Sequence, residues 1–199
     1  VPGTAEAEFD KNMIIETSFP ETDVKFYDVR KPPFDLYNFY KPESEAIFHR
    51  LPTDVAANTN AGVVKLEREP AGGRLKFTTD SQYIILRAEY ESVGRNTHMT
   101  LEMSAGFDLY LDDEDSTRYL KPLLPPYNLK DSYEQIARFS SRKERSYLIH
   151  FPLHAVVKNV YDKPSAKALK ILTEILGEME INVNVNQSEK PKIVFDDGE

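Results

Sequence analysis

The residues best suited to nucleophilic chemistry are Ser140 and Lys143, which stand in the order Ser-Ser-Arg-Lys. A lysine three residues after a serine can activate that serine as a nucleophile. Here the tetrapeptide lies in a polar stretch between two strand-like runs, without the companion motifs of that chemistry and without a Gly-x-Ser-x-Gly elbow elsewhere. We therefore interpret residues 140–143 as a hairpin turn, and we identify no catalytic residue in this chain.

Two other groups have side chains that bind metal ions. His150 and His154 would share one face of a helix and could hold zinc, but Pro152 and the period-two pattern around it indicate a strand. Along a strand, four residues span about 13 Å, too far for one ion. Residues 112–115 offer the oxygen ligands that calcium prefers, but lack the glycine and the distal glutamate of an EF-hand loop. We predict a solvated hairpin loop, no metal site and no cofactor.

Aromatic side chains are the remaining candidates for ligand binding. The chain has 11 tyrosines and no tryptophan, the residue that offers a sugar ring its largest flat platform. A local cluster of Phe34, Tyr37, Phe39 and Tyr40 is compatible with a glycan site or with core packing. The sequence leaves both interpretations open.

Composition restricts the possible partners. The chain has 199 residues, 40% hydrophobic and 29% charged, with a net charge of −8 and no cysteine. The acidic balance argues against nucleic acid, because phosphates are bound through lysine and arginine. No apolar stretch approaches the roughly 20 residues that a membrane-spanning helix needs. The sequence therefore predicts a globular chain with neither a nucleic-acid partner nor a membrane span.

The pattern of the chain is that of a β-sandwich or barrel, because short apolar runs recur about every 8–12 residues from Val24 onward. Alternation predicts three sets of inward-facing side chains: Ile84, Leu86, Ala88 and Tyr90; Phe107, Leu109 and Leu111; and Ile181, Val183 and Val185. Residues 121–126 contain three prolines and are expected to form an exposed connection. One helix is predicted from Ser165 to Met179, and a last strand from Lys192 to Phe195.

Seven short motifs carry a resemblance to a known family. In chain order they are Tyr27-Asp28-Val29-Arg30, Pro33-Phe34, Arg50-Leu51-Pro52, Gly72-Gly73-Arg74, the Phe77–Ser81 stretch, His98-Met99, and Gly106-Phe107-Asp108-Leu109-Tyr110. Over residues 24–160 the chain resembles the N-terminal GxDLY domain found upstream of SGNH (GDSL-like) hydrolase domains in bacterial esterases.

The resemblance implies an all-β fold, an antiparallel sandwich of jelly-roll type, followed by a flavodoxin-like catalytic domain. The expected organisation is an N-terminal arm over residues 1–20, the sandwich over 21–187, and a linker or first strand of the hydrolase over 188–199. Residues 190–195 followed by Gly198 resemble the approach to the family's nucleophile, with no serine after them. The chain alone is therefore predicted to have no esterase activity.

The function implied is that of a non-catalytic accessory domain of a secreted or periplasmic serine esterase acting on acylated carbohydrate. A stand-alone carbohydrate-binding module and a structural protein-interaction domain are the alternatives. The expected partners are the catalytic domain and an oligo- or polysaccharide.

Within the matching motifs, the polar residues expected to contact substrate are Arg50, Asp80, His98, Asp108 and Tyr110. The competing interpretation is structural: Asp80 caps a turn, while Asp108 and Tyr110 join neighbouring strands by hydrogen bonds.

Overall fold

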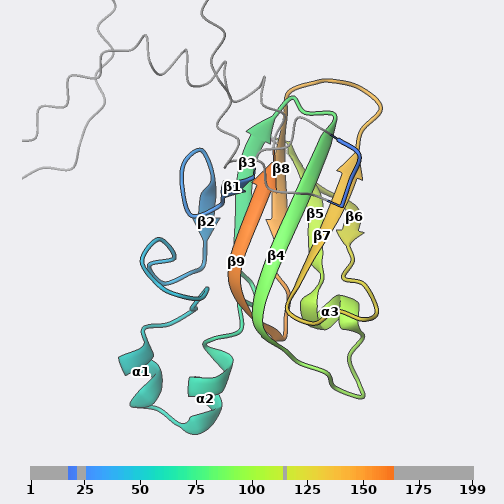
Figure 1. Cartoon of the computed structure of the whole chain (residues 1–199). Helices are drawn as coiled ribbons and strands as arrows, with labels where there is room; N and C mark the ends of the chain where they lie inside the picture. The colour runs from blue at the N-terminus through green and yellow to red at the C-terminus, as the bar shows by residue number, and fades with distance from the viewer. Residues whose placement is uncertain (1–17, 22–25, 114–115, 164–199) are drawn as a thin grey trace, which may run out of the picture.

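The computed structural model describes residues 18–21, 26–113 and 116–163. Within them, two antiparallel sheets lie face to face (Figure 1). The four-stranded sheet runs in the order β1 (Tyr27–Asp28), β9 (Ala155–Lys163), β4 (Tyr83–Val93) and β7 (Ser132–Arg138). The five-stranded sheet runs β2 (Asp35–Tyr37), β3 (Arg74–Thr79), β8 (Arg145–His150), β5 (Phe107–Asp113) and β6 (Ser116–Leu123). Neighbouring strands are mostly distant in sequence, as in a jelly roll, and the predicted fold class is confirmed.

The core lies between the sheets, where the side-chain alternation predicted it. On β4, Ile84, Leu86 and Ala88 are fully buried, and on β5 Phe107 and Leu109 are at most 1% exposed. Four phenylalanines pack together at one end of the sandwich with ring centroids 4.8–5.1 Å apart: Phe39, Phe48, Phe107 and Phe151. Offset aromatic packing of this kind adds to the free energy gained by burying the rings.

The outer face of the four-stranded sheet is covered near its middle. Ile85 points away from the core yet is fully buried. Beside it, the Arg87 Nε donates to Glu134 on the neighbouring strand at 2.6 Å, and the Arg87 guanidinium lies 4.1 Å from the Phe26 ring. The Ser18 hydroxyl also donates to Glu134, at 3.1 Å. Ser18 and Phe26, which precede β1, therefore cover Arg87 and Glu134 on this face.

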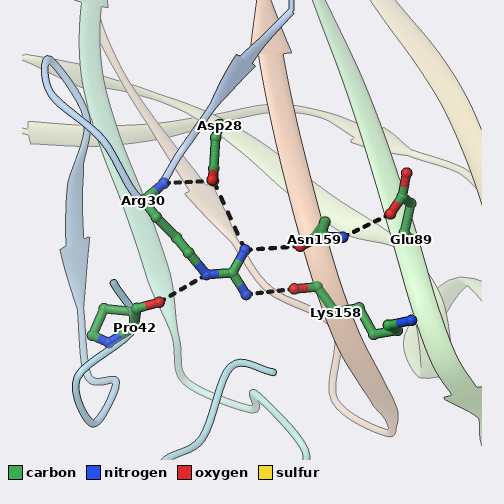
Figure 2. A network of polar contacts seen from close by, with 6 residues as sticks. All are labelled: Asp28, Arg30, Pro42, Glu89, Lys158 and Asn159. Atoms are coloured by element: carbon green, nitrogen blue, oxygen red, sulfur yellow. Dashed lines mark hydrogen bonds and ion pairs between the residues drawn. The ribbon is translucent and has the colours of Figure 1, made fainter. Parts of the chain in front are cut away.

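Arg30, which follows β1, joins four parts of the chain (Figure 2). Its Nε donates to the carbonyl of Pro42 at 2.7 Å, and its two Nη atoms donate to the Asn159 side chain and the Lys158 carbonyl on β9. Asp28 accepts from the Arg30 amide at 3.0 Å, and the guanidinium lies 4.1 Å from the Phe48 ring centroid. Burial lowers the pKa of Arg30, although the charge of Asp28 opposes that change.

Three short helices within the described residues were not predicted: α1 (Thr53–Ala57), α2 (Ala61–Leu66) and α3 (Leu101–Ala105). They are too short to show a helical hydrophobic period. The α2 helix is capped by the Asn60 side chain, which accepts hydrogen bonds from Gly62 and Val63. No helix in the described ranges is long and apolar enough to cross a membrane.

The expectation that residues 121–126 form a connection was wrong for its first part. Lys121, Pro122 and Leu123 belong to β6, where Pro122 pairs with Asp108. Proline is tolerated there because β6 is an edge strand, so its missing N–H can face outward. The helix predicted from Ser165 to Met179, the strands at 181–185 and 192–195, and the linker over 188–199 lie outside the described residues.

Candidate functional site

Two rows of side chains cross the outer face of the five-stranded sheet. Cross-strand register aligns the first row as Tyr37, Arg74, His150 and Asp108, and the second as Asp35, Lys76, Leu148, Tyr110 and Tyr119. Unlike the other sheet, this face leaves large aromatic rings open, with Tyr37 43% and Tyr119 49% exposed. It therefore presents a polar and aromatic surface, which we call the motif face because it contains Asp108 and Tyr110.

Asp108 and Tyr110 both point outward, since Phe107, Leu109 and Leu111 of the same strand point into the core. The Tyr110 ring packs between His150, at 4.7 Å between centroids, and Tyr119, at 5.4 Å. Among the described residues, neither the Asp108 carboxylate nor the Tyr110 hydroxyl makes a hydrogen bond. A hydrogen-bonded bridge to neighbouring strands through these side chains is thus not seen within that part of the chain.

The two cations of the motif face differ in their pairing. Lys76 forms an ion pair with Asp112 at 2.7 Å, which lowers the pKa of Asp112. Arg74 forms no ion pair with a described residue, and its buried Nε has no hydrogen-bond partner among them. Its guanidinium lies 5.9 Å from the Tyr37 ring centroid. An unpaired guanidinium beside an exposed ring can donate several hydrogen bonds to a bound ligand.

His150 sits between Arg74 and Asp108 in the first row. Burial lowers its pKa, the charge of Arg74 lowers it further, and the charge of Asp108 partly opposes both. The imidazole is therefore neutral near pH 7, with one nitrogen that donates and one that accepts. The imidazole of His150 and the acceptor oxygens of Asp108 lie side by side, so one row of the motif face contains both hydrogen-bond donors and acceptors.

Titration of His150 tests this arrangement. We expect its pKa, measured from the ring proton shifts by NMR, to lie below the ordinary value of 6.5. Arg74→Gln should raise that pKa and Asp108→Asn should lower it further, because each removes one of the two opposing charges. Since the unfolded chain binds the proton more tightly, His150 stabilises the fold above about pH 6.5 and this contribution is lost as the pH falls. A pKa unchanged in both variants would contradict the placement of His150 between these charges.

The other three predicted site residues lie elsewhere. The Arg50 side chain donates to the Leu66 carbonyl at the end of α2, 3.2 Å from its Nε. Asp80 forms an ion pair with Arg142, 2.6 Å apart, in the loops at one end of the sandwich. His98 is exposed in the connection between β4 and α3. The structure thus brings together Asp108 and Tyr110, and it adds His150, Arg74 and Tyr119, which sequence reasoning missed as site residues.

The candidates for catalysis and metal binding are dispersed. Residues 140–143 lie in the loop between β7 and β8. These strands belong to different sheets, so the loop crosses from one sheet to the other and the predicted hairpin turn was wrong. His154 pairs with Glu69 and His49 with Glu67, each through Nδ1 at 2.6 Å. The His154–Glu69 pair ties the end of the segment around α1 and α2 to the β8–β9 connection, whereas the His49–Glu67 pair joins the two ends of that segment. In the described ranges no three histidine or acidic side chains gather as a metal site.

A jelly-roll sandwich whose five-stranded sheet has an outer face of polar and aromatic residues defines the class of this domain. The model of the GxDLY family, described as the "N-terminus of Esterase_SGNH_hydro-type", matches residues 24–161. The chain belongs to this family, whose signature is here Gly106 to Tyr110.

Two similar solved structures share the fold. One, described as a GDSL-like lipase from Bacteroides ovatus, is 20% identical with a TM-score of 0.62 and aligns with 71% of this chain and 41% of its own. The other is the salicylyl-acyltransferase SsfX3 from a tetracycline biosynthetic pathway, which is 16% identical with a TM-score of 0.52. The alignment covers 71% of this chain and 40% of SsfX3. The chain thus spans less than half the length of either protein. No curated protein sequence matches it.

Proposed function

We propose that this chain is a non-catalytic accessory domain of an SGNH-type esterase, and that its motif face binds the saccharide part of an acylated carbohydrate. The observation that carries the proposal is the orientation of Asp108 and Tyr110. Both signature side chains lie half-buried on the outer face of the sheet, without a hydrogen-bond partner among the described residues. A purely structural aspartate would be expected to accept hydrogen bonds within its own fold.

The chemistry of the motif face suits a sugar ring. Tyr119, which is 49% exposed and packs against Tyr110, provides a flat ring against which the C–H groups of a pyranose can pack. Asp108 supplies acceptors for sugar hydroxyls, while Arg74 and His150 supply donors. A neutral saccharide needs no net charge at its site, and the flanking Lys76–Asp112 pair is already neutralised.

Titration with oligosaccharides tests the proposal. We expect xylohexaose or cellohexaose, plain or chemically acetylated, to shift the NMR signals of Tyr110, Tyr119 and His150. Tyr119→Ala and Asp108→Asn should each weaken binding by about fivefold or more, roughly the effect of losing one stacked ring or one hydrogen bond to a charged group. Tyr127→Ala is the matched control, because Tyr127 is 94% exposed in the β6–β7 loop and lies off the sheet.

The protein-interaction alternative has one observation in its favour. Four apolar side chains on or beside α1 and α2 are 38–47% exposed: Leu51, Val55, Val64 and Leu66. Figure 1 shows these two helices projecting beside the sheets. An exposed apolar patch is a common mark of a protein interface, and a catalytic domain is the partner that the family supplies. If no oligosaccharide shifted the signals of the motif face, the accessory role would consist of docking alone.

A further inference from the structure

A concavity lies at the end of the sandwich where β6, β7 and β8 come together. It has a volume of about 420 Å³, and three arginines line it: Arg118, Arg138 and Arg145. Leu111, Leu120 and Phe139 provide its apolar lining, together with Ser140 and Tyr147. We call this concavity the arginine pocket. It is separate from the motif face, because Leu111 and Tyr147 are inward-facing residues of the core.

The positive charge of the arginine pocket is only partly neutralised. Arg138 forms an ion pair with Glu21, 2.8 Å apart. Arg145 donates to the carbonyl and hydroxyl of Ser141 at 3.3 and 3.1 Å, which leaves its charge uncompensated. Arg118 makes no ion pair within the described part of the chain. Arg118 and Arg145 thus line one pocket without an ion pair to a described residue, in a chain of net charge −8.

A buried polar atom faces the same pocket. Tyr147 is fully buried, and its hydroxyl makes no hydrogen bond of standard geometry with a described residue. Burial raises the pKa of Tyr147, and the nearby Arg145 guanidinium opposes that increase. A ligand that accepts a hydrogen bond from this hydroxyl would give it a partner of good geometry.

We propose that the arginine pocket binds an organic carboxylate with an apolar body. Planar guanidinium groups match the two oxygens of a carboxylate. Glu21 already contacts Arg138 of the rim, through one carboxylate oxygen. The lining of Leu111, Leu120 and Phe139 would contact an aromatic ring or a short alkyl chain. A small hydrated ion such as inorganic phosphate gains nothing from that apolar lining. The proposal goes beyond the accessory function and does not depend on saccharide binding.

Calorimetric and NMR titration of the full chain with benzoate tests the proposal. Benzoate is expected to bind and to shift the signals of Leu111, Leu120 and Phe139, while benzyl alcohol, which has the same ring without the charge, does not. Arg118→Gln should weaken benzoate binding by about tenfold, the worth of one charge-assisted hydrogen bond. Because Arg118 is exposed on the edge strand β6, this variant is expected to fold. Tyr147→Phe should weaken binding about threefold or more.

Arg142→Gln is the matched control, since it removes the same charge from the neighbouring loop, where Arg142 pairs with Asp80. Its affinity for benzoate should remain unchanged within about twofold. Three results would overturn the proposal. They are equal binding of benzoate and benzyl alcohol, equal losses in Arg118→Gln and Arg142→Gln, and binding of phenyl phosphate much tighter than that of benzoate.

Discussion

Replacing Arg30 with methionine is expected to lower the free energy of unfolding by about 3–5 kcal/mol, as when a buried ion pair loses one partner. The Arg30 side chain is only 9% exposed, and methionine would fill most of its volume without replacing its donors. The carbonyls of Pro42 and Lys158, the Asn159 side chain and the Asp28 carboxylate would each lose a partner. Urea denaturation monitored by circular dichroism measures the loss, with the slope of the transition checked for constancy.

Two further variants separate the geometry of Arg30 from its charge. Arg30→Lys keeps the charge but cannot reach three acceptors at once, so we expect a loss between those of wild type and Arg30→Met. Arg68→Met is the control, because Arg68 pairs with Glu91 through side chains 38% and 46% exposed. Such a surface pair is worth less than about 1 kcal/mol. Equal losses in Arg30→Met and Arg68→Met would show that the network in Figure 2 does not stabilise the fold.

The sequence predicted the sandwich because its strands obey a period of two. On β4 and β5 the residues predicted to face inward do lie in the core, since one face of each strand packs against it. Val93 of β4 also packs against the core, but it follows bulges that break the alternation and was not predicted. The pairing of strands that are distant in the sequence produces no comparable local sequence pattern. The sequence alone does not show that β5 lies beside β8 or that Asp108 lies opposite His150, because both depend on cross-strand register.

Only the site residues that lie together on one strand, β5, could be predicted from the sequence. Asp108 and Tyr110 share a face of β5, so alternation places them together. Arg74, His150 and Tyr119 come from β3, β8 and β6. Arg50, Asp80 and His98 lie in connections, whose path in space no sequence period constrains. The sequence therefore identified the strand at the centre of the motif face and missed its neighbours.

Gly106, the first residue of the family signature, has an explanation that the sequence could not give. Its φ of −78° and ψ of 158° are open to any residue, so backbone freedom is not the reason for glycine. Its amide donates to the Glu102 carbonyl at 2.7 Å as α3 ends. A β-carbon at this position would lie 2.5 Å from that same carbonyl oxygen. The glycine is required because the start of β5 lies directly against the backbone of α3.

Gly106→Ala is therefore expected to lower the free energy of unfolding by about 2–3 kcal/mol, since the blocking atom is backbone and cannot rotate away. To relieve the contact, β5 must shift relative to α3, so amide signals of Asp108 and Tyr110 should move in the NMR spectrum. Gly62→Ala is the matched control: the added carbon would meet only the Asn60 side chain, at 3.1 Å, and stability should change by less than about 1 kcal/mol. If both alanine variants unfolded at the same urea concentration, close packing of α3 against β5 would not be what the signature glycine provides.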